Sequence, residues 1–298
     1  MSTPERRIAL SSPWIDERDE ELVLEVLRSG WLSLGPTGPR FEELLAAAVD
    51  APYCAAVSSG TSGLHLCMRL ADVGPGDEVI TSPYSFVASA NCAMYEGATP
   101  VFADIDPNTY NLDPAAVEAA ITPKTKMLII NTPQRPNGMV VGQLPEIAEI
   151  CKEHGIVVLT DEIFSHMVYD PSKHESISYV EGMKDQSIVV DTFSKTYIMT
   201  GFRIGWCVAN AELITTMDIF QQNSVTNVPA FVQLAGLAAM TGPQDHVAQQ
   251  TARLKAKRDD FAAQAAKLLS AGENAALAAM HPPGGSVPLT RAGAMNGA

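Results

Sequence analysis

Lys195 and Arg203 are the residues of this chain whose types and spacing most clearly suggest chemistry. They lie in the run Asp191-Thr-Phe-Ser-Lys-Thr-Tyr-Ile-Met-Thr-Gly-Phe-Arg-Ile-Gly-Trp206. A lysine amine can form a Schiff base with an aldehyde, and a guanidinium offers a fork of N–H donors to a phosphate. A surface position is the usual alternative for a lysine, but this one stands between an apolar strand and a glycine-bearing aromatic segment. The pair therefore predicts a site for pyridoxal phosphate (PLP), which carries both groups.

A carboxylate at the end of an apolar strand is the second candidate. Asp161 and Glu162 follow the run Ile156-Val-Val-Leu-Thr160. A carboxylate buried there needs a partner, and a protonated pyridine nitrogen is one that would keep the ring an electron sink. Glu162 competes with Asp161 for this role. The alternative is that one of the two acids caps a helix and the other is a surface charge.

Ser59-Gly60-Thr61-Ser62 is predicted to connect a strand to a helix. Gly60 allows the backbone to approach an anion, and the first amides of the helix attract one. A plain N-cap explains the same residues, because serine and threonine are favoured there. The chain has no GxxxxGK[ST] run, which argues against a nucleotide P-loop. Phe86 could stack on a flat heteroaromatic ring, and a place in the core is an equal alternative.

The elements that must position these residues alternate between helices and short apolar strands, which favours an α/β fold with a mostly parallel sheet. Helices are expected over residues 16–29, 39–49, 61–71, 85–95, 114–121 and 144–154, and beyond residue 211 the pattern is helical, through 228–240 and then 245–269. Strands are expected over 54–58, 78–81, 99–103, 126–130, 156–160, 187–191 and 205–209. Ligands bind beyond the carboxyl ends of such strands. The turn at 59–62, Asp161 and Lys195 are therefore predicted at one rim. Residues 281–298, rich in Gly, Pro and Ala, read as a loose tail.

Composition narrows the class of protein. The 298 residues carry a net charge of −14, which argues against non-specific binding to nucleic acid or an anionic membrane. Five scattered cysteines without a CxxC pair argue against a disulfide framework and a zinc site, so we expect a reducing cytoplasm. The charged first thirty residues do not read as a signal peptide. No apolar run approaches ~20 residues, so no transmembrane helix is expected.

From about residue 131 to 269 the chain resembles the class I/II, aspartate aminotransferase-like branch of the fold-type I PLP-dependent aminotransferases. The Ser-Lys-x5-Gly-x-Arg-x-Gly pattern and the upstream Asp-Glu-Ile-Phe carry this resemblance. It implies a three-layer α/β/α fold. It also implies that Lys195 forms the Schiff base, that Asp161 pairs with the pyridine nitrogen, and that Ser194 and Arg203 bind the phosphate.

The first 130 residues resemble instead the DegT/DnrJ/EryC1 branch, which contains sugar and aminohydroxybenzoate-type aminotransferases. The similar runs are Gly30-Trp-Leu-Ser-Leu-Gly-Pro36, Ser58-Ser-Gly-Thr-Ser-Gly-Leu-His-Leu66, Gly76-Asp-Glu-Val-Ile-Thr81 and Gly97-Ala-Thr-Pro-Val-Phe-Ala-Asp-Ile-Asp106. This resemblance implies that Gly60, Thr61 and Ser62 hold phosphate and that Phe86 covers the ring. The chain therefore reads as a hybrid joined near Ile130, and we infer a recombinant, reconstructed or generated sequence as a hypothesis.

Three departures from the class I/II pattern bear on activity. Arg135 stands where an Asn normally reaches the cofactor's ring oxygen, and Phe164 stands where a Tyr shares that contact. The ring hydroxyl thus loses two donors unless Arg135 or Asn131 substitutes for them. The substrate-carboxylate arginine of that branch lies in a C-terminal small domain, which Arg291 and its surroundings resemble weakly. We expect that domain to be mostly missing.

Together these features predict an aminotransferase that moves an amino group between an amino donor and a keto or oxo acceptor. The alternatives are a PLP-binding hybrid with little turnover and another fold-type I reaction, such as elimination or decarboxylation. We expect an N-terminal arm and helix over residues 1–40 and a large PLP-binding domain over 41–240. A linking helix with a truncated small domain or loose tail is expected over 241–298. The resemblance implies a homodimer, and the choice between sugar and amino acid substrates stays open.

Overall fold

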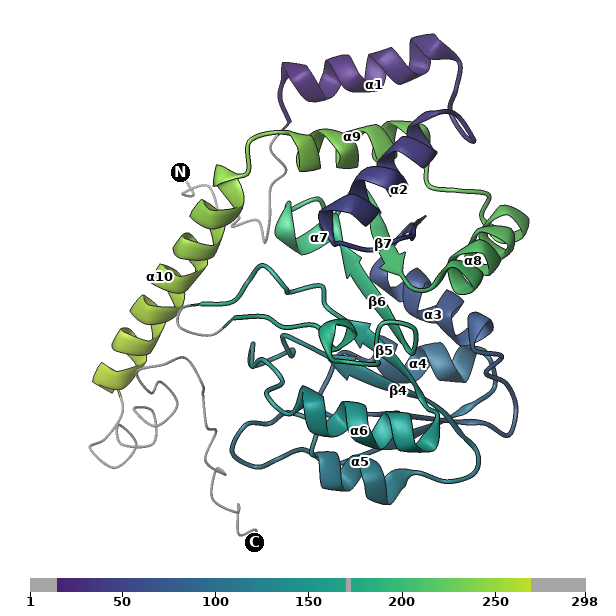
Figure 1. The fold of residues 1–298 in the computed structure, drawn as a ribbon. Coiled ribbons are helices and arrows are strands. Elements are labelled where there is room, and N and C mark those ends of the chain that lie inside the picture. The colour runs from purple at the N-terminus through teal and green to yellow at the C-terminus, as the bar shows by residue number, and fades with distance from the viewer. Residues whose placement is uncertain (1–14, 170–172, 269–298) are drawn as a thin grey trace, which may run out of the picture.

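A seven-stranded sheet organises the computed structural model of the chain, which describes residues 15–169 and 173–268 (Figure 1). The strands are β1 (Cys54–Val57), β2 (Glu78–Thr81), β3 (Thr99–Phe102), β4 (Thr125–Asn131), β5 (Val157–Asp161), β6 (Ser187–Thr192) and β7 (Gly205–Val208). Their order is β1-β7-β6-β5-β4-β2-β3. β7 runs antiparallel to both of its neighbours, and the other strand pairs are parallel. Six strands therefore point their carboxyl ends to the same rim.

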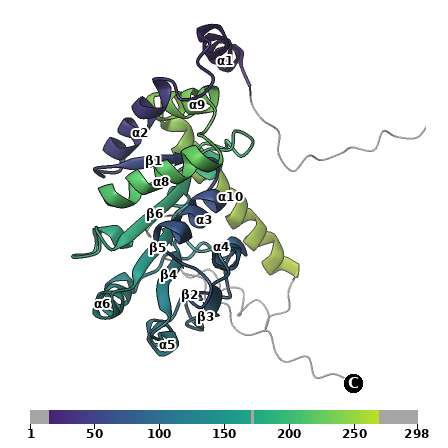
Figure 2. The ribbon, with the colours of Figure 1, turned by 90° about the vertical axis from the view of Figure 1, so that its right-hand side faces the viewer.

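Helices cover both faces of this sheet (Figure 2). On the first face, α3 (Gly60–Leu70), α4 (Ala88–Tyr95) and α8 (Ala211–Ser224) bury a core that includes Met68, Cys92 and Met217. On the second face lie α5 (Pro114–Ala120), α6 (Leu144–His154) and the 3-10 turn η1 (Ile177–Tyr179), with α2 (Thr37–Ala48) and α9 (Ala230–Thr241) beside them. The predicted three-layer α/β/α arrangement is confirmed.

The remaining helices lie at the edges of this sandwich. α1 (Glu17–Ser29) packs on α9 and ends at Gly30, whose φ of 75° is the left-handed conformation that a C-terminal glycine supplies. α7 (Phe193–Thr196) is a single turn after β6. α10 (Asp245–Leu268) leads away from the sheet (Figure 1). No helix in the described ranges is long and apolar enough to cross a membrane.

The predicted elements are present, with shifted ends at two places that matter for the site. α4 begins at Ala88 rather than at Ser85, and the hydroxyl of Ser85, in the loop before it, donates to Asn131 Oδ1. β5 includes Asp161, which the sequence placed just after the strand. The predicted tail and Arg291 lie outside the described residues.

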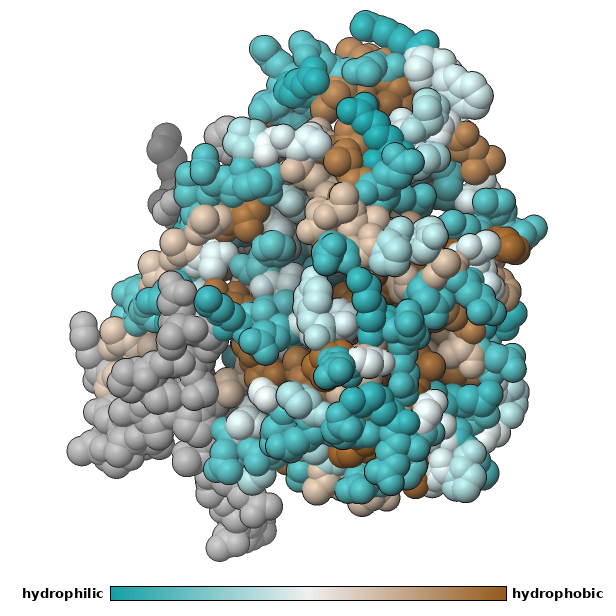
Figure 3. Space-filling model, in the orientation of Figure 1, coloured by the Kyte–Doolittle hydropathy of each residue, from teal (hydrophilic) through white to brown (hydrophobic). Residues whose placement is uncertain are grey.

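The surface agrees with the acidic composition. Figure 3 shows hydrophilic side chains over most of one side of the molecule, with hydrophobic ones gathered in smaller groups. Exposed apolar residues include Leu27 of α1 and Trp31 just after it, which are 53% and 59% exposed. The buried core lies between the sheet and its helices.

Candidate cofactor site

The predicted site residues meet at the rim where the parallel strands end. Asn131 of β4 is paired in register with Asp161 of β5. Gly205, at the start of β7, is paired with Thr192 of β6 on one side and with Val57 of β1 on the other. The segments that follow these strands, far apart in sequence, therefore begin side by side. The predicted convergence is confirmed.

Gly60 packs directly against the ends of the neighbouring strands. A Cβ added to Gly60 would lie 3.2 Å from Thr192 Cγ2 and 3.6 Å from Ile163 Cγ2. At Gly205 an added Cβ would lie 2.8 Å from the Asp191 carbonyl oxygen, a distance that real Cβ atoms do not reach. Gly205 is therefore required by close approach of the Asp191 backbone, whereas Gly60 lies in tight contact with the side chains of Thr192 and Ile163. The turn at residues 59–62 thus lies against the end of β6 and the segment that follows β5.

This turn is an N-cap and also a potential anion site. The Ser62 amide donates to Ser59 Oγ at 3.1 Å, and the Ser59 amide donates to Ser62 Oγ at 2.9 Å, which makes a capping box. The Ser62 hydroxyl donates in turn to the Ser59 carbonyl oxygen at 2.7 Å. The amide and the hydroxyl of Ser62 therefore both donate within the turn itself. Within the described part of the chain the amides of Gly60 and Thr61 have no hydrogen-bond partner, so they remain available to an anion.

Asp161 is a buried carboxylate with no charge partner of opposite sign among the described residues. It is 7% exposed and accepts from Asn131 Nδ2 at 3.2 Å and from the Ile163 amide at 3.3 Å. Burial, together with the neighbouring Glu162 charge, raises the pKa of Asp161 to about 6. A cation at this position would lower that pKa and relieve the cost of burial. The geometry fits a protonated ring nitrogen.

Asn131 connects Asp161 to the loop before α4. Its Oδ1 accepts from the Ser85 hydroxyl at 2.7 Å and from the Ser89 hydroxyl at 3.2 Å. Because both hydroxyls occupy the oxygen side of the amide, its NH2 group faces Asp161. Sequence reasoning missed both serines, since nothing in their spacing shows that the loop and the first turn of α4 lie against the end of β4. Asn131 is thereby engaged with Asp161 rather than free to replace a missing donor.

Lys195 lies on α7 and is half-buried. Its Nζ is 5.9 Å from the centroid of the Phe164 ring, and no carboxylate pairs with it in the described ranges. The Ser194 amide donates to Thr192 Oγ1 at 3.3 Å, while the Ser194 hydroxyl has no partner there. Arg203 is exposed, adopts the unusual φ of 61°, and donates from Nη1 to the Thr200 carbonyl oxygen at 2.9 Å. The rest of its fork is available to a phosphate.

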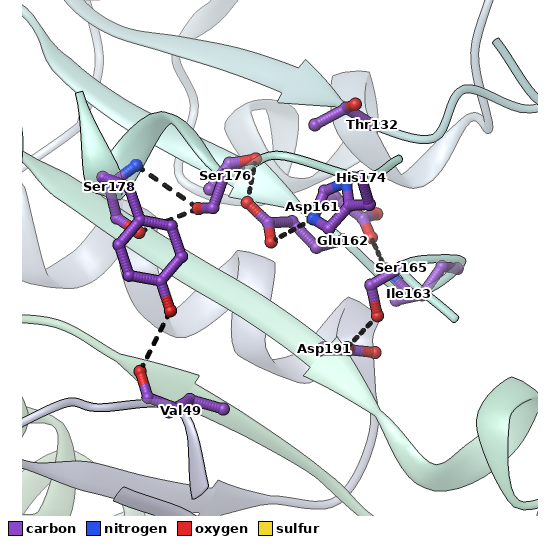
Figure 4. Close-up of polar contacts among 12 residues, drawn as sticks. Val49, Thr132, Asp161, Glu162, Ile163, Ser165, His174, Ser176, Ser178 and Asp191 are labelled. Carbon is purple, nitrogen blue, oxygen red and sulfur yellow. Dashed lines mark hydrogen bonds and ion pairs between the residues drawn. The ribbon is translucent and has the colours of Figure 1, made fainter. Parts of the chain in front are cut away.

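Glu162 points to the second face of the sheet (Figure 4). Its Oε2 lies 2.7 Å from His174 Nε2, and its Oε1 accepts from the Thr160 hydroxyl at 3.0 Å. Both proposed alternatives for this acid are wrong, because it is neither a helix cap nor a surface charge. Nearby, Asp191 accepts from the Ser165 hydroxyl at 3.0 Å, and burial holds the pKa of Asp191 well above its usual value. Glu162 is therefore satisfied by the protein itself.

Phe86 and Arg135 meet above the rim. The guanidinium carbon of Arg135 is 5.0 Å from the centroid of the Phe86 ring, which is a cation–π contact. Phe86 is 44% exposed, so the alternative that placed it in the core is wrong. Phe86 adjoins Ser85, whose hydroxyl donates to Asn131, the residue that in turn donates to Asp161.

These donors and acceptors fit PLP. Asp161 can hold the ring nitrogen, and the free amides of Gly60 and Thr61, the Ser194 hydroxyl and the Arg203 fork can hold a phosphate. Lys195 supplies an amine without a carboxylate partner in the described part of the chain. The structure also shows no cluster of three or more His, Cys, Asp or Glu side chains arranged for a metal ion in those residues.

Comparisons with a family model, with curated proteins and with solved structures agree on the fold and the family. The model of the DegT/DnrJ/EryC1/StrS aminotransferase family matches residues 13–173. The spore coat polysaccharide biosynthesis protein SpsC of Bacillus subtilis (strain 168) is 43% identical over 170 residues, which are 57% of this chain and 42% of that protein. An aspartate aminotransferase of Geobacillus stearothermophilus is 34% identical over 178 residues, which are 58% and 45% of the two chains. The chain spans about half the length of the curated relatives it matches.

A solved structure agrees with these sequences. The aromatic aminotransferase from Pyrococcus horikoshii OT3 superposes with a TM-score of 0.75 at 27% identity, and the match covers 84% of this chain and 70% of that one. The family match runs past the predicted junction at Ile130, and relatives of both predicted branches are found.

Proposed function

The chain belongs to the DegT/DnrJ/EryC1/StrS aminotransferase family, and from this premise we propose that it is a PLP-dependent aminotransferase. The observation that carries the proposal is Asp161, a buried acid with no cation beside it among the described residues, at the same rim as the Lys195 amine. The family uses PLP, whose ring acts as an electron sink that makes the substrate Cα–H bond acidic. The residues described above have the chemistry to use that acidity.

Lys195 and Asp161 have distinct roles in this proposal. Lys195 Nζ would hold the cofactor, and its amine would move the proton at the substrate Cα. Asp161 would keep positive charge on the ring nitrogen. Its low exposure would keep water away from that ion pair, which would strengthen it.

The turn and the segment after β6 would hold the phosphate end. The amides of Gly60 and Thr61 lie at a helix N-terminus, where the dipole favours negative charge. Ser194 Oγ and the Arg203 fork would add donors from the segment after β6. We assign Ser62 the role of holding this turn, because its own donors are used within it.

A second function, PLP binding with slow turnover, is favoured by the groups near the ring oxygen. Phe164 carries no hydroxyl, and Arg135 stacks on Phe86. A different fold-type I reaction, such as decarboxylation or elimination, remains the third candidate.

Turnover by the loaded chain tests these functions. We expect purified protein with bound PLP to convert L-glutamate to 2-oxoglutarate, about one equivalent per chain without an oxo acceptor and continuously with one. Lys195→Ala should abolish both phases while leaving the fold intact by circular dichroism. Bound PLP without any oxo acid formed would favour the binder, and release of carbon dioxide would favour a decarboxylase.

The assembly, location and origin of the chain also belong to the proposal. A homodimer is supported by the aminotransferase family, whose members are commonly dimers. A reducing cytoplasm is supported by the five cysteines, all of them free and buried. The hybrid origin is supported by relatives of two kinds, one named for polysaccharide biosynthesis and one an aspartate aminotransferase.

A further inference from the structure

A cavity of about 240 Å³ lies on the face of the sheet to which Glu162 points (Figure 4). Two cross-strand pairs of β6 and β7 line it, Asp191 with Trp206 and Val189 with Val208. Paired residues of neighbouring strands point to the same face of a sheet, and so do alternate residues of one strand. The register of β6 and β7 therefore places a carboxylate, an indole and two valine side chains together in this cavity.

Two buried carboxylates line this cavity, and no lysine or arginine does so among the described residues. Glu162 has a partner of possible opposite charge, because its Oε2 lies 2.7 Å from His174 Nε2. Asp191 has none in the same ranges. Its oxygens accept from the Ser165 hydroxyl at 3.0 Å and from the Thr192 amide at 2.5 Å, and it is 5% exposed. A buried carboxylate with only neutral donors attracts a cation.

The electrostatic surroundings of Asp191 also favour a cation. Burial holds the pKa of Asp191 well above its usual value, and the charges of Glu162 and Asp161 raise it further. The two histidines that line the cavity do not supply the missing charge. Burial and the neighbouring His174 lower the pKa of His166, and His174 is engaged with Glu162. A cation bound in the cavity would therefore offset the cost of burying Asp191.

The rest of the lining is aromatic and apolar. Tyr179 of η1 lines the cavity, and its hydroxyl donates to the Val49 carbonyl oxygen, at the end of α2, at 3.3 Å. Its ring and that of Trp206 offer π faces to a cation. Val49, Val189 and Val208 add apolar contact. The described residues include no group of three or more His, Cys, Asp or Glu suited to a metal ion. One acidic corner with apolar and aromatic walls suits an organic cation instead.

A smaller cavity of about 60 Å³ adjoins the first and shares Val49, Tyr179 and Val189 with it. Its lining includes Ser187, which precedes Val189 by two positions on β6 and so points to the same face. Ser187 is 2% exposed, and its hydroxyl has no hydrogen-bond partner in the part of the chain that the structure describes. Buried polar atoms without partners are rare in native proteins. β6 thus presents two incompletely satisfied polar groups, Ser187 and Asp191, on this face.

We propose that the larger cavity binds a small alkylammonium ion, with the ammonium group on Asp191 and the alkyl chain against Trp206 and the valines. A charge-assisted hydrogen bond to the carboxylate and cation–π contact with the rings would hold it. The volume of about 240 Å³ lies below the range of about 300 to 1,000 Å³ that is common for ligand clefts, which limits the chain to a few carbons. Asp161 points to the opposite face, so the inference does not depend on the proposed function.

Titration of the cofactor-free chain with n-butylammonium, followed by the NMR signals of the ligand, tests this. We expect binding of about millimolar affinity and none of n-butanol, which has the same length and no charge. Asp191→Asn should weaken binding about tenfold or more, the effect of losing a hydrogen bond to a charged group. Tyr179→Ala should weaken it about threefold through the lost ring. Asp161→Asn is the matched control, because this acid is also buried but faces the other side, and it should bind as wild type does.

Equal binding by wild type and Asp191→Asn would overturn the proposal, as would an equal loss in Asp161→Asn. Circular dichroism checks that the variants fold. If Asp191→Asn does not fold, Tyr179→Ala decides, because its ring is 70% exposed, and unchanged binding there would overturn the proposal. Displacement of n-butylammonium by an equal concentration of potassium chloride would also overturn it and assign the cavity to an inorganic cation. Equal binding of n-butanol, or no binding at all, has the same consequence for the alkylammonium site.

Discussion

Asp161 and Glu162 are adjacent in sequence and both are buried, yet they have different hydrogen-bond partners. Asp161 accepts from a side-chain amide and a backbone N–H and has no cation beside it in the part of the chain that the structure describes. Glu162 meets His174 and Thr160 on the opposite face. Successive side chains of a strand point to opposite faces, so one step along the chain separates an incomplete site from a complete one. Burial alone does not mark a cofactor-binding acid, and neither does the lack of a charge partner, because Asp191 is also buried and bonded only to neutral donors among the described residues. Asp161 differs from Asp191 in lying beside Asn131 at the rim.

The largest expected effect is a loss of turnover when Asp161 is replaced. Asp161→Asn should lower PLP-dependent turnover about a thousandfold, because the neutral amide cannot hold positive charge on the ring nitrogen. Glu162→Gln keeps the hydrogen bond from Thr160 and should leave turnover within about threefold. The steady-state rate of each variant, divided by the concentration of folded chain, measures the two effects. Equal inactivation of both variants would break the distinction between the two acids.

The next largest expected effect is a loss of folding stability when the partner of Glu162 is removed. His174→Ala should lower the free energy of unfolding by about 3 kcal/mol, because it leaves a buried carboxylate without its partner. Denaturation in guanidinium chloride measures this. Adding Glu162→Gln to His174→Ala should recover part of the loss, and PLP binding should not change. If His174→Ala unfolds at the wild-type midpoint, the pair is not a structural one.

Protonation of Asp161 should make the stability of the cofactor-free protein depend on pH. Its pKa in the folded chain, about 6, lies above its ordinary value of 3.8. Its contribution is therefore fully present below pH 3.8 and is lost as the pH rises through 6. Between pH 4.5 and 7.5 wild type should lose about 2 kcal/mol relative to Asp161→Asn. Denaturation at both pH values measures the difference, and a constant difference would mean that Asp161 titrates normally.

The smallest effect concerns the residues that orient Asp161. Ser89→Ala removes one of two hydroxyls on Asn131 and should weaken PLP binding about fivefold, the effect of one neutral hydrogen bond. Ser176→Ala removes a hydroxyl on the Glu162 side, where its partner is Ser178. Fluorescence titration with PLP should detect the first change and not the second. Similar changes in both would show that the two sides are not independent.

The sheet and its rim were predictable because the apolar runs and the turn residues are local signals. The antiparallel direction of β7 was not, since a run such as Gly205–Val208 has the same period in either direction. The sequence also could not show which of Asp161 and Glu162 has no charged partner within the described residues. It depends on His174, which another loop brings to Glu162, and on Ser85 and Ser89, which reach Asp161 only through Asn131. Partners that arrive through tertiary packing leave no spacing rule in the sequence.

The most direct test of the central claim is to reduce the PLP-loaded protein with sodium borohydride and map the modified peptide by mass spectrometry. We predict one pyridoxyl group per chain, on Lys195, and its absence in Lys195→Ala. The loaded wild type should also show an absorbance band that borohydride removes. Labelling spread over surface lysines such as Lys173 and Lys184, or no labelling at all, would contradict the assignment of this rim as the cofactor site.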